Sequence, residues 1–356
     1  MKAAIYRDFG GQICVEDVPI PQIASDGILV QVKATGVCRS DWHGWKGHDG
    51  DVRHHGLPFC PGHELSGIVV KSGPNVSNLL VGDRVVAPFI LSCGSCHYCD
   101  NHRSTVCLKQ EQPGFTFWGS FAEYVSIPRA DWNVKKLPNN VSFIQAAALG
   151  CRFTTAYRAV LQQGRFQAGE TIAVFGCGGV GLSCVMIAAA KKAHRIIAVD
   201  VSKRALEKAK DLGATHVILC NDNTQVRNEV KELGPVGDGA DVCIDAAGFP
   251  SSCENAVHST RRAGRMVQVG LPIGDVSPNI PMGLVAGWEI EILGSHGFAA
   301  DNLCSLLEMI SNGSLNPGNL VEKQVSLAEG AQSLIDMDHG SPLGITMITK
   351  FHESRL

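Results

Sequence analysis

The sequence has no long hydrophobic run and no large excess of charge of either sign. No apolar stretch reaches the roughly 20 residues that a membrane-spanning helix needs. The first residues, Met1 to Tyr6, enter strand-like alternation without an apolar signal region. The formal net charge of −3 argues against nucleic acid or a membrane surface as a partner. We therefore expect a cytoplasmic protein.

Cysteine, by contrast, is abundant, with 14 residues in a chain of 356. A chain of this length can form two domains with their own cores, so a disulfide framework of the kind found in short secreted proteins is not expected. Four of the cysteines lie between Cys93 and Cys107, and the others are scattered. The cluster is typical of metal ligands, whereas the scattered residues are expected to be small buried hydrophobic groups.

The first ~150 residues read as β-rich. Short β-branched runs at 28–34, 65–70 and 84–88 are separated by clusters of glycine, proline and asparagine. This pattern predicts a small antiparallel barrel or sandwich with long loops.

The pattern changes near Phe153, after which apolar strands alternate with helical segments. This alternation predicts a doubly wound parallel sheet and an α/β fold class. Ser202 is the expected N-cap of one of the helices. The chain then continues as two helices and a closing strand, 344–351, and we expect this tail to rejoin the first domain. The expected strands of the sheet are 172–175, 195–201, 216–219, 242–246 and 265–269.

A glycine loop follows the first of these strands. The sequence F-G-C-G-G-V-G places Gly176, Gly178, Gly179 and Gly181 between an apolar strand and the helix expected at 179–192. In this context G-x-G-x-x-G predicts dinucleotide binding. The first glycine makes the tight turn, the second admits the pyrophosphate at the helix N-terminus, and the last lets the helix pack on the sheet.

Asp200 ends the next strand, nineteen residues after Gly181. A carboxylate there can accept hydrogen bonds from both hydroxyls of the adenosine ribose and repels a 2′-phosphate, which favours NAD over NADP. Lys203 and Arg204 follow closely, so use of both cofactors stays open.

The four clustered cysteines, Cys93, Cys96, Cys99 and Cys107, have the spacing C-x2-C-x2-C-x7-C. Two-residue gaps allow successive thiolates to bind one tetrahedral ion. The intervening residues are too polar to form a core, so a metal is needed to hold the segment together. We expect a structural zinc, with an iron–sulfur cluster or free thiols as the alternatives.

Three further segments carry candidate ligands. Cys38 lies in G-V-C-R-S-D-W-H, His63 and Glu64 in P-G-H-E-L-S-G, and Cys151 in L-G-C-R-F-T-T. With the four-cysteine lobe, the glycine loop and Asp200 in this order, they resemble the zinc-containing medium-chain alcohol dehydrogenase family over essentially the whole chain. The resemblance implies a GroES-like catalytic domain (1–153 and 295–356, with the lobe at about 92–108), a Rossmann NAD-binding domain (154–294) and an active site in the cleft between them.

The resemblance also assigns ligand roles. Cys38, His63 and Cys151 would bind a catalytic zinc, and Glu64 would be an occasional fourth ligand that exchanges with water. Asp41 would hold His63 through its other ring nitrogen.

Further roles concern proton transfer and the cofactor. Ser40 would accept the proton of the alcohol, and His43 would complete a relay to solvent. The implied cofactor contacts are Arg39 with the pyrophosphate, Thr155 and Val180 with the nicotinamide, and the backbone of Val269–Leu271 with its carboxamide.

The implied activity is reversible hydride transfer between a primary aliphatic or aromatic alcohol, or its aldehyde, and NAD(H). Each chain would hold two zinc ions, one catalytic and one structural, in a homotetramer or dimer. One alternative is a polyol or secondary-alcohol dehydrogenase of the same superfamily, although polyol enzymes often carry a carboxylate in place of the third cysteine. The other is a catalytically silent NAD-binding relative.

Two positions depart from the family pattern. Arg152 stands where a small residue is expected after the third ligand, and it is interpreted equally as a charge acting on the pocket or the cofactor phosphate and as a surface residue. Gly344 is followed by Ile345 rather than by the phosphate-binding arginine of some members.

An apolar substrate pocket is expected from the tryptophans. Trp42 and Trp118 are predicted to line it, and Trp45 is a further candidate that could equally belong to the core. The segment 48–56 is expected to be a mobile loop at its rim.

Overall fold

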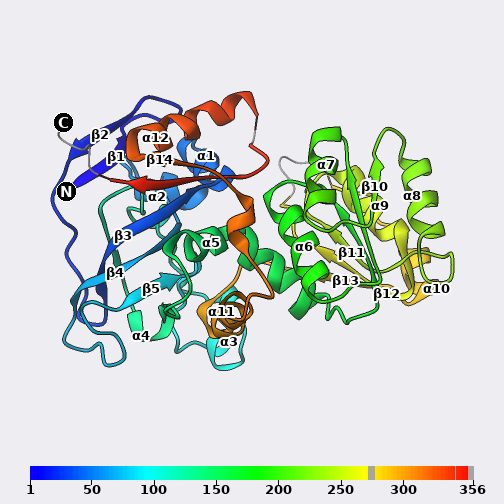
Figure 1. Ribbon diagram of the computed structural model, residues 1–356, viewed down its shortest axis with the longest axis horizontal. Coiled ribbons are helices and arrows are strands. Elements are labelled where there is room, and N and C mark those ends of the chain that lie inside the picture. Colours follow the sequence, from blue (N-terminus) through cyan, green and yellow to red (C-terminus); the bar gives the residue numbers. More distant parts are fainter. Residues whose placement is uncertain (272–276, 341, 352–356) are drawn as a thin grey trace. The chain divides into compact units, whose positions relative to one another are not determined.

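The computed structural model describes residues 1–271, 277–340 and 342–351, which form two compact units (Figure 1). The first contains Met1–Thr154 together with the described residues from Gly297 onward, and the second contains Thr155–His296. Among the described helices, none has the length and apolar character to cross a membrane.

The first unit is built on β-sheets. A seven-stranded sheet contains β3 (Ile28–Val37), which pairs in antiparallel fashion with β4 (Glu64–Ser72), β15 (Ile345–Lys350) and β6 (Tyr124–Ile127). In the same sheet, β14 (Val321–Ser326) and β15 pair in parallel. A separate antiparallel pair is formed by β1 (Lys2–Tyr6) and β2 (Ile13–Asp17). In spatial order the main path is β14 (Val321–Ser326), β15 (Ile345–Lys350), β3 (Ile28–Val37), β4 (Glu64–Ser72), β5 (Arg84–Ala87) and β7 (Lys135–Lys136), with β6 (Tyr124–Ile127) beside β3.

Two apolar clusters stabilise this unit. One gathers Val30, Leu65 and Val125 between the strands, and the other contains large aromatic side chains such as Phe59 and Phe121. The expected return of the chain's end is seen in β15, whose residues pair with the last residues of β3. The helices of the unit are α1 (Arg39–Trp45), α2 (Gly50–His55), α3 (His97–Asp100), α4 (Ala130–Asn133), α11 (Leu303–Ser311) and α12 (Leu327–Ile335), with α5 (Phe143–Tyr157) leading into the second unit.

The second unit contains a six-stranded parallel sheet, as the alternation of strands and helices predicts. Its strand order is β10 (His216–Leu219), β9 (Arg195–Asp200), β8 (Thr171–Phe175), β11 (Ala240–Asp245), β12 (Thr260–Gln268) and β13 (Glu291–Gly294). The order reverses at β8, and ligands of such sheets bind at the carboxyl ends of the strands beside this point. The helices are α6 (Gly179–Ala190), α7 (Lys203–Asp211), α8 (Asn223–Glu232), α9 (Pro250–Ser259) and α10 (Met282–Trp288).

The predicted fold class, a β-rich domain with a doubly wound parallel-sheet domain, is therefore confirmed. The predicted N-cap is confirmed as well, because the Ser202 hydroxyl accepts a hydrogen bond from the backbone N–H of Ala205 at the start of α7.

One expectation about the first unit was wrong, and the place of Trp45, which the sequence left open, is decided. The segment 48–56 is not a loop throughout, because α2 forms within it, and the Asp49 carboxylate caps this helix by accepting hydrogen bonds from the N–H groups of Asp51 and Val52. Trp45 belongs to the core, one of its two possible places. It is 2% exposed and packs in the aromatic core cluster, with its indole N–H donated to the carbonyl of Gly11.

Candidate functional site

Cys38, His63 and Cys151 come together in the structure from three separate elements. Cys38 precedes α1, His63 precedes β4, and Cys151 lies within α5. One potential ligand atom from each lies within 4.8 Å of the others. The helical path of α5 breaks at Gly150, where φ is 25° and ψ is −142°. A side chain is strained at this conformation, so glycine is what permits the break one residue before the third ligand.

Asp41 organises this group through three hydrogen bonds. Its Oδ1 lies 2.8 Å from His63 Nδ1 and accepts the N–H of Gly62 at 2.9 Å, while its Oδ2 accepts the N–H of Cys38 at 3.1 Å. His63 Nε2 is buried and has no hydrogen-bond partner among the described residues. A buried imidazole nitrogen without a partner is costly unless it binds an ion, so this atom fits a metal ligand oriented by a carboxylate.

The chemistry of the donors fits zinc. Two thiols and one imidazole form a Cys2His set, which is typical of catalytic zinc sites that leave a fourth position for substrate. The hydrogen bond from the Cys151 thiol, followed by the charge of Arg152, holds the pKa of the Cys38 thiol well below its usual value despite burial. A thiolate is the form that binds a metal.

Glu64 lies next to this group, but it is not among the residues whose potential ligand atoms all lie within 4.8 Å of one another. The side chain is fully buried, and its Oε1 accepts the N–H of Cys151 at 3.0 Å. Burial raises the pKa of Glu64 to about 7, against the opposing effect of the positive charge of Arg152. Its role as an occasional ligand stays a prediction.

Arg152 is not a surface residue. It is 7% exposed, and its Nε and Nη2 lie 3.3 and 3.4 Å from the two carboxylate oxygens of Glu64. The guanidinium also donates to the carbonyl oxygens of Val37 at 2.8 Å and Gly344 at 3.5 Å. The sequence could not decide between the two interpretations of Arg152, because its ionic partner lies 88 residues away.

The four-cysteine lobe forms a second group of potential ligands. Cys96 Sγ lies 3.6 Å from Cys99 Sγ and 3.8 Å from Cys107 Sγ, and Cys93 Sγ lies 3.9 Å from Cys99 Sγ. A tetrahedral ion with Zn–S bonds of about 2.3 Å separates its sulfurs by about 3.8 Å. Backbone N–H groups, those of Cys99 and Leu108, lower the pKa of Cys96 to about 6, which favours the thiolate. The geometry therefore fits one structural zinc.

The residues predicted for proton transfer lie on α1. Ser40 Oγ is 3.8 Å from Cys38 Sγ, which places this hydroxyl beside the ligand group. His43 Nδ1 lies 3.1 Å from Nδ1 of His48, an exposed residue that the sequence analysis did not single out. Burial, followed by the positive charges of Arg39 and His48, lowers the pKa of His43. His43 therefore favours its neutral, proton-accepting form.

Arg39 and the candidate pocket tryptophans have partners within the first unit. The Arg39 guanidinium stacks on the Trp42 ring at 3.4 Å and donates to the carbonyl of Met337 at 2.6 Å. The indole N–H of Trp42 is donated to Asp338, and that of Trp118 to the carbonyl of Pro58. The pyrophosphate contact of Arg39 and the pocket roles of both tryptophans stay predictions.

The glycine loop of the second unit has the geometry that each glycine was expected to provide. Gly176 has φ of +91°, the left-handed conformation of a tight turn. A Cβ on Gly178 would meet no atom of the described part of the chain within 4 Å, so the backbone there is open to an approaching group. A Cβ on Gly181 would lie 1.8 Å from the carbonyl oxygen of Gly176, so only glycine lets α6 pack this close to the loop. Gly179 is the first residue of α6.

Asp200 ends β9 beside this loop. Its Oδ2 accepts the N–H of Cys177 at 2.6 Å, and its Oδ1 accepts the N–H of Ser202 at 2.7 Å. Each carboxylate oxygen can accept a second hydrogen bond, so both remain able to bind ribose hydroxyls. The other predicted cofactor contacts in this unit are Thr155, which is buried, Val180 in the first turn of α6, Lys203 at the start of α7, Val269, which is 9% exposed, and Leu271, which is 74% exposed.

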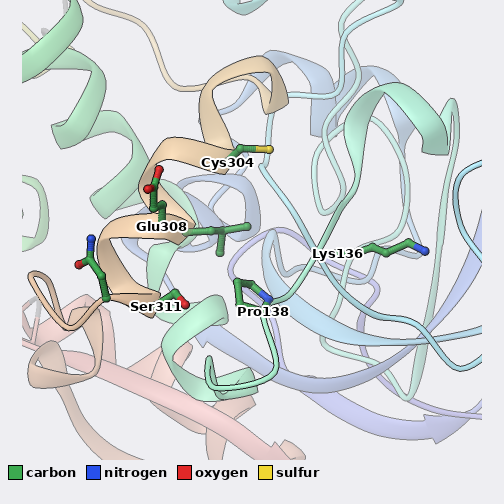
Figure 2. A pocket seen from close by; sticks show the side chains of 7 residues that line it. Lys136, Pro138, Cys304, Glu308 and Ser311 are labelled. Atoms are coloured by element: carbon green, nitrogen blue, oxygen red, sulfur yellow. The ribbon is translucent and has the colours of Figure 1, made fainter.

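A separate surface pocket of about 460 Å³ lies in the first unit (Figure 2). Figure 2 shows Cys304, Glu308 and Ser311 on α11, opposite Lys136 and Pro138. The pocket contains none of the predicted site residues. It is therefore separate from both groups of metal-type ligands and from the glycine loop.

Comparisons with known proteins agree with these two units. The alcohol dehydrogenase GroES-like domain matches residues 24–139, and the zinc-binding dehydrogenase domain matches residues 179–312. An alcohol dehydrogenase of Geobacillus stearothermophilus is 35% identical over 325 residues, which cover 91% of this chain and 92% of that protein. The sorbitol dehydrogenase of Bacillus subtilis is 33% identical over 92% of this chain and 91% of its own.

A solved structure is similar over almost the whole chain. The alcohol dehydrogenase of Thermus sp. ATN1 superposes with a TM-score of 0.88 at 28% identity and covers 99% of this chain and 100% of its own. The two domain matches, the relatives above 30% identity and the two groups of zinc-type ligands point to the same assignment. This chain is an oxidoreductase that belongs to the zinc-containing medium-chain alcohol dehydrogenase family.

Proposed function

We propose that this protein is a zinc-dependent dehydrogenase that transfers hydride between a primary alcohol, or its aldehyde, and NAD(H). The observation that carries the proposal is the convergence of Cys38, His63 and Cys151 around a buried imidazole nitrogen that has no hydrogen-bond partner among the described residues. When bound there, zinc supplies Lewis-acid polarisation of the substrate oxygen.

The protein's own side chains orient the ligands and move the proton. Asp41 fixes the ring of His63, so that Nε2 is the atom presented to the metal. As Ser40 accepts the proton of the alcohol, its own hydroxyl proton moves on toward His43, and His43 passes a proton to solvent through its exposed neighbour His48. Because alcohol oxidation releases this proton, the rate of oxidation is expected to rise with pH.

The glycine loop and Asp200 support NAD as the cofactor. The open backbone at Gly178 and the N-terminus of α6 suit a pyrophosphate, since unpaired N–H groups at a helix start favour an anion. The charge of Asp200 opposes a 2′-phosphate. We propose that the protein works as a homotetramer or dimer, which sedimentation analysis would test.

A polyol substrate is the second candidate, because sorbitol dehydrogenase is among the relatives at 33% identity. Two features favour a simple alcohol. The third ligand, Cys151, is a thiol rather than a carboxylate, and the candidate pocket walls Trp42 and Trp118 are apolar indoles that would give few hydrogen bonds to a row of hydroxyls.

The first experiment combines metal analysis with a substrate panel. We expect two zinc ions per chain and NAD reduction with ethanol, hexanol or benzyl alcohol at a kcat/KM at least about tenfold above that for sorbitol or xylitol. Cys38→Ser should remove about one zinc and turnover while circular dichroism stays unchanged. A preference for sorbitol would favour the polyol function, and two bound zinc ions with no turnover of any alcohol would contradict both.

A further inference from the structure

The proposed reaction does not use the ion pair between Glu64 and Arg152. Glu64 is fully buried and Arg152 nearly so. Glu64 accepts the N–H of Cys151, and Arg152 interacts with Cys38, so both lie beside the ligand group. Burying a charged pair costs free energy that its attraction often does not recover. A stability role is therefore a weak explanation of the pair, and its position beside three metal ligands suggests another.

The carboxylate of Glu64 is held in one place by its surroundings. A Cβ on Gly36 would lie 2.2 Å from Glu64 Oε2, and a Cβ on Gly150 would lie 2.5 Å from Glu64 Cδ, so both glycines leave room for this carboxylate. The N–H of Cys151 binds Oε1 at 3.0 Å. These contacts hold the Glu64 carboxylate, a potential oxygen ligand, beside Cys38, His63 and Cys151, although Glu64 is not a member of that ligand group.

Arg152 attracts the Glu64 carboxylate and so competes with a metal ion for it. Its Nε faces Oε1 at 3.3 Å and its Nη2 faces Oε2 at 3.4 Å, so each carboxylate oxygen has a guanidinium nitrogen as a partner. The carbonyls of Val37 and Gly344 accept further hydrogen bonds from the same guanidinium and fix its plane. A fork held on two sides in this way binds a carboxylate with defined geometry, which lysine cannot reproduce.

We propose that Arg152 is a positioning residue, which binds both oxygens of Glu64, holds the carboxylate out of the donor set and so keeps the fourth coordination position available to substrate. This proposal rests on the proposed function, because it concerns access of the alcohol to the same zinc site. The proposal assigns Arg152 no contact with substrate or cofactor. Its positioning role acts through Glu64, while its charge also favours the thiolate of Cys38.

The test compares Arg152→Gln with the double variant Arg152→Gln/Glu64→Gln. We expect the single variant to keep its metal content and to raise the KM for the alcohol about tenfold, with a smaller change in kcat, because the released carboxylate competes with substrate. The double variant removes both charges and replaces the carboxylate with a weaker ligand. Its KM is expected to return to within about threefold of the unmodified protein.

A second readout needs no turnover. With Co²⁺ exchanged for zinc, visible absorption reports the ligand set, and bands of the four-cysteine lobe cancel in the difference between variants. Without substrate, the visible spectrum of Arg152→Gln should differ from that of the unmodified protein, and the spectrum of the double variant should not. Arg265→Gln, which breaks the Arg265–Glu170 pair in the second unit, is the matched control and should change neither readout.

The outcomes separate this inference from the proposed function. An unchanged spectrum and KM in Arg152→Gln, or an equal defect in the double variant, would overturn the role of Arg152. If Arg152→Gln does not fold, Arg152→Lys must show the same spectral change in smaller size, and its absence would overturn the proposal equally. If the unmodified protein oxidises no alcohol, the proposed function fails, while the cobalt spectra still decide whether Arg152 restrains Glu64.

Discussion

Asp200 binds two backbone N–H groups in addition to its predicted contact with the cofactor. The effect of substituting Asp200 therefore has two possible causes. Its carboxylate already accepts the backbone N–H groups of Cys177 and Ser202, at 2.6 and 2.7 Å. Removing it would therefore loosen the glycine loop and would also remove the negative charge from the position where the ribose is predicted to bind. Only a comparison of two cofactors in the same variant separates these effects, because the loop is common to both.

Asp200→Gly is expected to raise the ratio of kcat/KM for NADP to that for NAD by at least about tenfold, or about 1.4 kcal/mol. The reason is that the substitution removes the charge that repels a 2′-phosphate. Asp200→Asn, which keeps one acceptor oxygen, should change the ratio in the same direction with less loss of stability. Steady-state kinetics with both cofactors measure the ratio, and an unchanged ratio would remove Asp200 from cofactor selection.

The lowered pKa of His43 leads to a prediction about the pH dependence of alcohol oxidation. Burial, followed by the charges of Arg39 and His48 and against those of Cys38 and Asp49, lowers its pKa from the usual 6.5. The neutral form accepts the proton, so a lowered pKa extends this form to lower pH. The acid limb of the kcat/KM profile for alcohol oxidation should therefore lie below pH 6.5.

His43→Gln is expected to abolish this acid limb and slow oxidation about a hundredfold at neutral pH. His54→Gln, at an exposed position on α2, is the control and should keep the profile unchanged. Persistence of the same limb in His43→Gln would show that another group titrates.

At the scale of elements, the junction of β8 and α6 contains two glycines with different surroundings, Gly181 in close packing and Gly178 with open space around it. A Cβ on Gly181 would collide with the Gly176 carbonyl, so Gly181→Ala is expected to destabilise the protein by about 1–3 kcal/mol or more. In Gly178→Ala the added methyl group would meet no atom of the described residues within 4 Å, so the melting temperature should stay unchanged. NADH binding should weaken about tenfold, because the methyl group would enter the space predicted for the pyrophosphate. Denaturant unfolding and NADH fluorescence test the pair, and unchanged NADH affinity in Gly178→Ala would refute the assignment.

The four-cysteine lobe gives a second prediction at this scale. Cys96→Ser removes one of four converging thiols and should release about one zinc per chain, with a fall in melting temperature of about 5 °C or more, since 1 kcal/mol shifts it by about 2–4 °C. Cys304→Ser is the matched control, because this cysteine is exposed on α11 in the surface pocket of Figure 2. Equal melting temperatures for the two variants would exclude a structural metal.

The strands were predictable from sequence, and some short helices were not. β-branched runs predict β3, β8 and β9 well, because these strands are buried and their side chains favour extended backbone. α1 and α2 are seven and six residues long and too short to show an apolar period. The N-cap Asp49 was the available signal for α2.

Site residues could be predicted where local sequence spacing identifies them. They could not be predicted where their role depends on a partner far away in the sequence. The lobe follows from the local spacing of its cysteines, which the structure brings within 4.8 Å. The contact of Arg152 with Glu64 joins positions 88 residues apart, and that of His43 with His48 depends on the turn after α1. No local pattern encodes such contacts, because tertiary packing creates them.

At the scale of the whole molecule, the two kinds of site belong to different units. Both groups of zinc-type ligands lie within Met1–Thr154, whereas the glycine loop and Asp200 lie within Thr155–His296, which has its own core around Ala173, Phe175 and Ile197. Each unit can therefore keep its binding groups in place when the other is perturbed.

Removal of zinc with a chelator should consequently abolish alcohol turnover and leave NADH affinity within about tenfold of the untreated protein. Loss of the metals should lower the melting temperature of the first unit, whereas NADH at 100 times its Kd should stabilise the second by about 2.7 kcal/mol. Calorimetry with and without NADH resolves the two contributions, and zinc added back should restore turnover. Loss of NADH binding on chelation would mean that the metal-bearing unit is required to complete the nucleotide site, whereas retained binding together with lost turnover would place zinc in the chemistry and the glycine loop in cofactor binding.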